Sequence, residues 1–470
     1  MTHLVHQNWR NCEAWKSSGL PLSTTSDEAA KMFDACLTQY VGWYNDESVD
    51  GIEGALSKMT NADPNFLMGH VMSVGLEMMA TAKTTRLDTS FRQDVDAMLK
   101  LAKNNHVTER EKKHVEAVKL WSDGKMDDAA YLWEDILISY PLDMLALKFA
   151  HDTYFYNGLQ YELMDSTARV LPHWKEDMPL YGYLMGMHSF GLVETNHFQE
   201  AERVAKKGLE INRHDSWSTH SVAHVFEMTG RADEGIAFMS KTVADWSPCE
   251  MLACHNFWHW AVYHVDKGEY SGALDLLDDQ MIASFKKSGA MFDMIDACSM
   301  LYRLELEGVD VGLKRWEDIY EMCRPHIDDH ILLFNDLHLL MACLGAKKRE
   351  VAQAFMASLR QFVENESDMN QVASKKFGIA MAEAFIAYDD GDYARAVELA
   401  NKVRYQLLMM GGSNAQRDVF HLFLVHAALK SDQPKHHKLA RNLIMERKSA
   451  RPGCKMNDRL LGKILGTHGQ

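Results

Sequence analysis

A short phrase recurs along the chain and constrains its fold more than any other feature. It consists of a turn residue, an aromatic or apolar residue two positions later, and Ala or Gly three positions further on. Consecutive copies begin 34 and 38 residues apart at positions 196, 230 and 268. The copies begin at Gly124, Asn196, Gly230, Gly268 and Gly391.

The phrase has a physical explanation as the turn of a helical hairpin. Gly or Asn ends the first helix in a left-handed cap, and the small residue lets the second helix approach closely. A proline such as Pro141 cannot continue the second helix. One hairpin cannot bury its apolar face alone, so neighbouring hairpins stack into a superhelix. The period and the phrase resemble the tetratricopeptide repeat, and we predict an all-α solenoid of such hairpins.

The length of 470 residues exceeds the size at which one compact core stops growing. We predict three segments along the array. Residues 1–105 form an N-terminal helical segment that caps the solenoid or packs across it. Residues 106–290 form regular repeats, and residues 291–470 form divergent helical repeats and a C-terminal cap.

Longer phrases are more specific than the repeat. Together they resemble the tetratricopeptide repeat protein 38 family over nearly the whole chain. The resemblance implies a cytosolic repeat protein and implies little about activity. The phrases are LPLSTTS (20–26), DMLALKF (143–149), MLACHN (251–256), SMLYRLELEG (299–308), DHILLFND (329–336) and GGSNAQRD (411–418).

Composition and charge limit the kinds of partner and the compartment that we expect for this chain. A net charge of −16 disfavours nucleic acid or an anionic membrane as the main partner, because both require a basic footprint. The most cationic stretch, 441–455, is interpreted as a solvated helix end. Eight cysteines without a C-x-x-C spacing are typical of a reducing compartment. No signal peptide or membrane span is recognisable, so we expect a cytoplasmic protein; its oligomeric state stays open.

Two histidine pairs stand out in this repeat background. His220 and His224 fall on a helix expected over 216–229, and His255 and His259 fall on a helix expected over 254–267. A four-residue spacing puts both imidazoles of a pair on one helical face. Because packed helices lie about 8–10 Å apart, all four imidazoles can converge on one groove.

These histidines predict a metal site. Neutral imidazole suits Zn²⁺ or Fe, and a catalytic site needs about three protein ligands with one open position. Glu227 and Asp336 are the candidate catalytic carboxylates, although the H-E-x-x-H motif itself is absent. The alternative is that the histidines are structural and satisfied by hydrogen bonds.

Further polar and aromatic residues are candidates for a ligand pocket in the same groove. Polar residues interrupt the apolar helix in DHILLFNDLH, and buried polar groups cost free energy unless they have partners. The start of the helix at Ser413 offers anion-binding amides near a basic side chain. The candidate pocket residues are Trp217, Trp258, His330, His338, Arg417, Asp418 and His421.

Two functions from different classes follow. The first is a metal- or small-ligand-binding pocket, which extends to a metal-dependent hydrolase or oxygenase acting on a small molecule. The second is a non-catalytic scaffold that binds a peptide in its groove, the usual role of this fold. A serine-nucleophile elbow and a glycine-rich phosphate loop are missing from the sequence. Fold alone does not choose between the two functions.

Overall fold

The structure is a computed structural model that describes residues 8–79, 83–104 and 106–467. Within these ranges every regular element is a helix, and there is no β-strand. The chain forms two compact units: Met1–Ser221 with Ala244–Ala253, and Val222–Val243 with Cys254–Gln470. The fold is an all-α array of helical hairpins, as the repeat predicts.

Among the described residues, unit 1 holds helices α1 to α11, and the division between the units passes through α12, α13 and α14. The helices of unit 1 are α1 (Cys12–Ser17), α2 (Asp27–Gly42), α3 (Gly51–Ala62), α4 (Leu67–Glu77), α5 (Thr89–Leu101), α6 (Glu109–Ser122), α7 (Met126–Ser139), α8 (Met144–Asn157), α9 (Gln160–Val170), α10 (Tyr181–Glu194) and α11 (Phe198–Ile211). The helices at the division are α12 (Ser216–Met228), α13 (Ala232–Trp246) and α14 (Glu250–Lys267).

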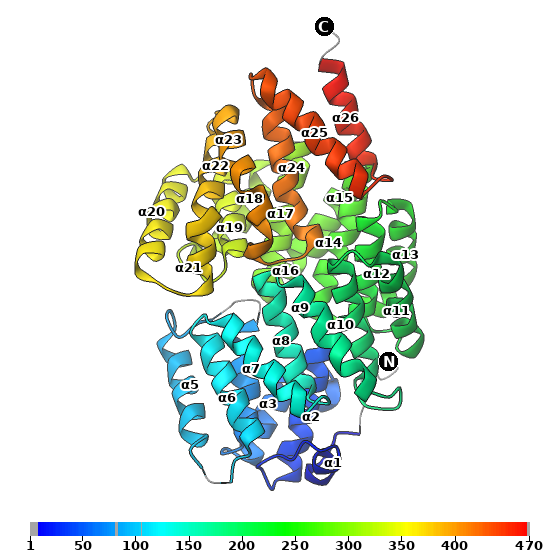
Figure 1. Ribbon diagram of the computed structural model, residues 1–470, viewed down its shortest axis with the longest axis vertical. Coiled ribbons are helices and arrows are strands. Elements are labelled where there is room, and N and C mark those ends of the chain that lie inside the picture. Colours follow the sequence, from blue (N-terminus) through cyan, green and yellow to red (C-terminus); the bar gives the residue numbers. More distant parts are fainter. Residues whose placement is uncertain (1–7, 80–82, 105, 468–470) are drawn as a thin grey trace. The chain divides into compact units, whose positions relative to one another are not determined.

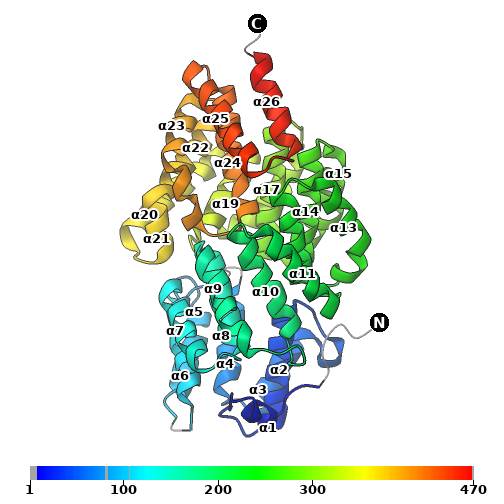
Figure 2. The same cartoon turned by 45° about the vertical axis from the view of Figure 1, so that its right-hand side comes forward.

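Unit 2 contains the remaining helices. Within it α22, α23 and α24 lie side by side in chain order (Figure 1; Figure 2). The helices are α15 (Tyr270–Leu276), α16 (Ala283–Ser288), α17 (Met291–Glu307), α18 (Leu313–Cys323), α19 (Leu333–Gly345), α20 (Arg349–Asn365), α21 (Met369–Ala373), α22 (Ile379–Asp389), α23 (Tyr393–Val403), α24 (Asn414–Lys430), α25 (Pro434–Ala450) and α26 (Lys455–Thr467). In unit 1 there are short 3₁₀ segments at η1 (Glu47–Val49) and η3 (Leu171–His173). In unit 2 there are 3₁₀ segments at η5 (Arg324–His326) and η7 (Arg404–Met410), and π segments at η4 (Leu277–Ile282) and η6 (Ser374–Gly378).

The turn residues of the repeat behave as predicted. Gly124, Asn196, Gly230, Gly268 and Gly391 all have positive φ, from 65° to 80°. This left-handed conformation ends one helix and starts the next. The hairpin prediction is therefore confirmed at each copy of the phrase.

The small residues of the phrase permit close helix packing. A Cβ atom added to Gly235 on α13 would lie 2.5 Å from the ring of Tyr263 on α14. Such a distance is shorter than any real carbon–carbon contact, so only glycine fits. The second helix of this hairpin, α13, and the first helix of the next, α14, consequently approach closely enough to fix the path of α14.

The N-terminal helices pack on the repeat helices of unit 1. Tyr40 on α2 donates its hydroxyl proton to Asp152 on α8, which also pairs with the fully buried Lys148. The Lys148 ammonium lies 4.7 Å from the centre of the Tyr40 ring and 5.0 Å from that of Trp217. Burial lowers the pKa of Lys148. This interior ion pair supports the prediction that the N-terminal segment packs onto the solenoid.

A second buried acid ties the C-terminal helices to α17 within unit 2. Glu307 at the end of α17 accepts hydrogen bonds from Tyr270 at 2.7 Å and Arg459 at 2.9 Å. His426 on α24 lies 3.4 Å away. Burial alone raises the pKa of Glu307, but these partners outweigh it and lower the pKa to about 2.

The boundaries predicted at 105 and 290 separate segments by the regularity of their repeats. The two compact units divide the chain by its internal contacts instead, so the predicted boundaries stay a prediction. Among the helices of the described ranges, none combines the length and apolarity that crossing a bilayer requires.

Candidate metal centre

The four paired histidines lie together. Their potential ligand atoms all lie within 4.8 Å of one another. His220 and His224 are one turn apart on α12, and His255 and His259 are one turn apart on α14. All four are buried, with exposures from 0% to 9%. The sequence prediction that the two pairs converge is confirmed.

Two carboxylates orient two of the imidazoles. Nδ1 of His255 lies 2.8 Å from Oδ2 of Asp296, and Nδ1 of His259 lies 2.8 Å from Oε2 of Glu227. Asp296 on α17 and Glu227 on α12 are themselves buried. A carboxylate that accepts from one ring nitrogen fixes the ring and its tautomer, which is the usual outer-shell arrangement of metal-binding histidines.

Aromatic packing restrains the rings further. The rings of His224 and His259 have centroids 4.3 Å apart, and those of His255 and His259 are 4.8 Å apart. Trp258 stacks on His255 with an interplanar angle of 9° and a centroid distance of 5.2 Å. Trp258, predicted as a pocket residue, thus acts as a wall of the histidine cluster.

The electrostatics favour uncharged imidazoles. Burial, together with repulsion from the neighbouring histidines, lowers the pKa values of His224 and His259 well below the usual range. Neutral imidazole is the form that binds a metal ion. Burial raises the pKa of Glu227 to about 7.

The cluster has the donor set for a tetrahedral ion. Ligand nitrogens bound at about 2.0–2.1 Å to tetrahedral Zn²⁺ lie roughly 3.4 Å from one another. The present separations extend to 4.8 Å, so binding would draw the rings together by rotation of the side chains. Four imidazoles would fill such a shell completely, and this differs from the open catalytic site that the sequence suggests.

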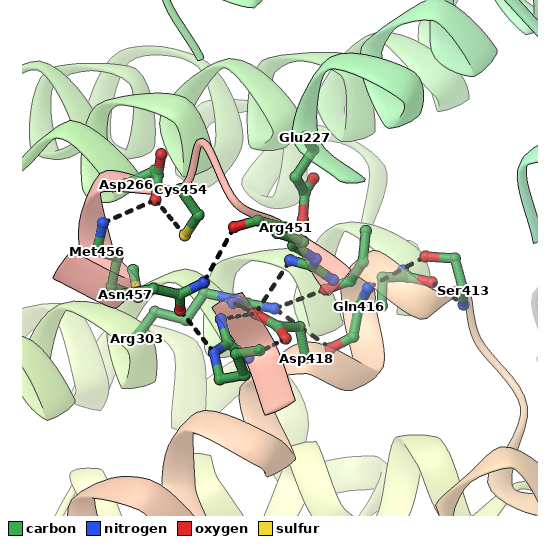
Figure 3. Close-up of polar contacts among 12 residues, drawn as sticks. Glu227, Asp266, Arg303, Ser413, Gln416, Asp418, Arg451, Cys454, Met456 and Asn457 are labelled. Atoms are coloured by element: carbon green, nitrogen blue, oxygen red, sulfur yellow. Dashed lines mark hydrogen bonds and ion pairs between the residues drawn. The ribbon is translucent and has the colours of Figure 1, made fainter. Parts of the chain in front are cut away.

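An arginine cluster lies beside Glu227 in unit 2 (Figure 3). Arg447 contacts both oxygens of Asp418, while Arg451 lies 3.5 Å and Arg303 lies 3.6 Å from Oδ2 of that carboxylate. Burial opposes ionisation, but the three guanidinium groups hold the pKa of Asp418 far below its usual range. The interpretation of 441–455 as a solvated helix end is wrong at Arg447 and Arg451, because both side chains are only 11% exposed.

A cavity of about 30 Å³ opens within this cluster. The volume accommodates about two water molecules. Glu227 is the one member of the metal centre that lines it, together with the arginines, Asp266 and Asp418. Asp266 accepts hydrogen bonds from the thiol of Cys454 and the backbone of Met456 (Figure 3).

Of the other predicted pocket residues, Trp217 contacts the histidine cluster, and Asp336, His330 and His338 lie elsewhere. The Trp217 ring lies 5.8 Å, centroid to centroid, from that of His220, and its Nε1 donates to the carbonyl of Val41 at 2.9 Å. Asp336, a predicted catalytic residue, hydrogen-bonds His330 rather than a histidine of the cluster. His338 contacts the carbonyl of Phe334 at 2.7 Å, and burial lowers its pKa to about 4.

The predicted anion-binding start of α24 is used by the protein itself. The Ser413 side chain caps the helix, and the side chain of Gln416 completes the capping box. Arg417 donates to the carbonyls of Gly411 and Gly412, and burial lowers the pKa of His421 to about 4.

The sequence reasoning missed Asp296, Arg447 and Arg451. Asp296 had a signal, since it is an acid within the apolar run of α17 that buries its side chain. The sequence carried no comparable signal for Arg447 and Arg451, because a basic stretch near a helix end is more often solvated.

Comparisons with known proteins find distant structural likeness. No family model matches the chain. Human IFIT1 bound to m7Gppp-AAAA is 11% identical with a TM-score of 0.40, covering 95% of this chain and 96% of that one. The Cut9–Hcn1 assembly of APC/C is 12% identical with a TM-score of 0.40, covering 97% and 88%. Yeast Tom70 is 12% identical with a TM-score of 0.31, covering 94% and 88%. Likeness at this level carries no inference about what the chain binds.

Proposed function

We propose that this protein is a helical-repeat scaffold that holds one divalent transition metal, Zn²⁺ or Fe²⁺, between α12 and α14. The observation that carries the proposal is the pair of carboxylate–histidine contacts at His255 and His259. With Nδ1 bonded to a carboxylate, Nε2 of each ring serves as the metal ligand. His224 and His220, on the facing helix, complete the shell.

Charge balance supports a divalent ion. The four imidazoles are neutral ligands, and Asp296 and Glu227 contribute two negative charges when ionised. A buried charge is costly unless an opposite charge compensates it. A doubly charged cation would offset both carboxylates, adding to the attraction that Arg451 and Arg303 already exert on Glu227, and bound metal would favour the ionised form of Glu227.

The role that follows is binding and reinforcement of the scaffold. Closed shells of four protein ligands are typical of structural metal sites, whereas catalytic sites keep a position open. The cavity beside Glu227 accommodates about two waters, which suits water or an ion better than an organic substrate. We therefore include no reaction in the proposal, and we assign Glu227 to positioning His259.

One observation favours a metal-free scaffold as the second candidate. Each carboxylate–histidine contact also satisfies two buried polar groups by itself. In that reading the groove holds a peptide, as repeat scaffolds commonly do. The difference between the two candidates is measurable.

The test is metal analysis of untagged protein purified without chelator. We expect about one equivalent of Zn or Fe per chain, lost in the double variant His224→Ala/His259→Ala. His338→Asn is the matched control, since His338 is equally buried but lies on α19, and it should retain the metal. Protein that stays metal-free after incubation with Zn²⁺, and gives no tetrahedral Co²⁺ absorption, would refute the metal centre and leave the scaffold.

Membership of the tetratricopeptide repeat protein 38 family and a cytoplasmic location belong to the same proposal. The phrases quoted from the sequence support the family. All eight cysteines are free thiols in the structure, which supports a reducing compartment. A small molecule or a peptide remains the proposed class of partner.

A further inference from the structure

A serine, a histidine and an aspartate are linked in unit 2, away from the histidine pairs in sequence. Nε2 of His330 lies 2.9 Å from Oγ of Ser358, and Nδ1 of His330 lies 3.1 Å from Oδ1 of Asp336. The serine is on α20, the aspartate is in the first turn of α19, and the histidine is in the loop before α19. A nucleophile next to a base that a third group orients is the arrangement of serine hydrolases, recognised by geometry rather than by sequence order.

The surroundings hold the imidazole firmly. His330 is 3% exposed, and its ring lies 5.5 Å from Phe355 and 5.4 Å from Phe362, centroid to centroid. The other oxygen of Asp336 lies 3.3 Å from Nδ2 of Asn370, which also donates to the His330 carbonyl at 2.8 Å. The carboxylate and its partner amide therefore fix the orientation of the base from one side.

The backbone at this position is strained. His330 has a φ of 45°, in the left-handed region that bulky side chains rarely adopt. Strain of this kind persists only where surrounding contacts impose it, and it clusters at functional sites. Here the strained residue is His330, which joins the serine to the aspartate. Ser358 itself is half-buried, so its hydroxyl lies close to the protein surface.

We propose that Ser358, His330 and Asp336 form a second site, in which Ser358 is a nucleophile toward small activated carboxylic esters. The Ser358 oxygen forms a bond to the ester carbonyl carbon, and its proton passes to Nε2 of His330. The carbon–oxygen bond of the leaving group breaks, and the imidazolium returns the proton to the departing alcohol oxygen. A water molecule then attacks the acyl-serine through the same base, releasing the acid and restoring the hydroxyl.

Asp328 determines how readily this serine reacts. The hydroxyl has one proton and three acceptors within reach: His330, Oδ1 of Asp328 at 2.8 Å and the Phe355 carbonyl at 3.0 Å. A proton donated to Asp328 is unavailable to the imidazole. Removing that carboxylate charge should therefore direct the proton to His330 and increase the reactivity of the serine.

The test uses an alkyl fluorophosphonate on the full-length protein, followed by intact mass and peptide mapping. The serine oxygen displaces fluoride from phosphorus, so one adduct on Ser358 is the expected product. Ser358→Ala should abolish it, and Ser240→Ala, which removes a hydroxyl on α13 bonded only to its own helix, should leave it unchanged. Asp328→Asn should accelerate labelling.

His330→Asn removes the base while keeping the fold, because asparagine tolerates positive φ. We expect labelling to slow by about 100-fold or more, the usual contribution of a general base. Asp336 is a positioning residue, so Asp336→Asn should slow labelling and Asp336→Glu should recover part of the rate. Hydrolysis of p-nitrophenyl acetate should follow the same order.

Three results would overturn the proposal: no adduct on the wild-type protein, equal labelling rates in wild type and His330→Asn, or slower labelling in Asp328→Asn. The site is independent of the metal centre. Labelling should persist in His224→Ala/His259→Ala and in the presence of EDTA, so the two proposals fail separately.

Discussion

Replacing Asp296 with Asn tests the carboxylate that orients His255. The substitution keeps a hydrogen-bond acceptor of the same shape 2.8 Å from Nδ1 but removes the negative charge that a divalent ion needs nearby. Loss of such an outer-shell partner typically weakens metal binding by about 10–100-fold. We expect the larger value, because Asp296 is 1% exposed and solvent does not screen its charge.

The effect on stability follows from mass action. At free metal equal to 100 times the Kd, binding stabilises the folded chain by about 2.7 kcal/mol. If Asp296→Asn raises the Kd by about 100-fold, the same free metal stabilises the variant by only about 0.4 kcal/mol. Metal should therefore raise the thermal unfolding temperature of wild type clearly and that of the variant hardly at all.

The assay is a Zn²⁺ titration against a chromophoric chelator, with unfolding followed in parallel. Asp293→Asn is the matched control. Asp293 is a buried acid one turn earlier on α17 that accepts hydrogen bonds from Ser284 and Ser288 and does not contact a ring nitrogen of His255 in the way Asp296 does. If the two variants bind Zn²⁺ equally well, Asp296 does not orient a ligand and the reasoning is refuted.

Three further predictions concern stability, each checked by equilibrium denaturation. Glu307 has a pKa lowered from 4.5 to about 2, so the stability that it contributes is complete above pH 4.5 and is lost as the pH falls toward 2. Over this window the free energy of unfolding of wild type should fall by up to about 3 kcal/mol. Glu307→Gln should be less stable than wild type at pH 7 and should lack this fall. Gly230→Ala should destabilise the protein more than Gly391→Ala. Both glycines have positive φ, but an added Cβ meets backbone atoms at 2.6 Å at Gly230 and open space at Gly391. Gly391→Ala should therefore lower the free energy of unfolding by about 1 kcal/mol, and an equal loss in the two variants would contradict the packing argument. Lys148→Met should cost about 3–5 kcal/mol because it leaves the buried Asp152 without its cation, and adding Asp152→Asn should recover part of that loss rather than add to it.

Sequence reasoning succeeded where the relevant geometry is local. The left-handed turn at Gly230 and the helix that precedes it follow from a cap and a 3.6-residue period. The predicted start of that helix at 216 matches α12. The helix predicted from 254 begins at Glu250 instead, because the buried Leu252 and Ala253 extend its packed face by one turn.

The histidine cluster was predictable from the sequence in its ring nitrogens but not in its carboxylate partners. The four-residue spacings fixed which rings share a face, and stacking of neighbouring helices brought the two faces together. The outer partners could not be found in the same way. Asp296 is 41 residues from His255, and no helical period connects them.

The same limit explains the error at the arginines and why the sequence did not connect Ser358 with His330. Arg447 sits in a basic stretch that is solvated in most helices, yet Asp418, 29 residues away, holds it in the interior. Ser358 stands in an ordinary amphipathic helix without an elbow motif, and its partner His330 is 28 residues away.

The hairpins of this protein, their turns, and the faces that each helix presents could all be predicted from its sequence. These depend on backbone conformation and on periodicity, which act within one or two helical turns. Which charges become buried against one another, such as Asp296 with His255 and Asp418 with Arg447, became visible when the helices were seen packed together. Those pairings depend on the packing of helices distant in the chain, because the free energy of a buried charge is set by the groups that surround it in space.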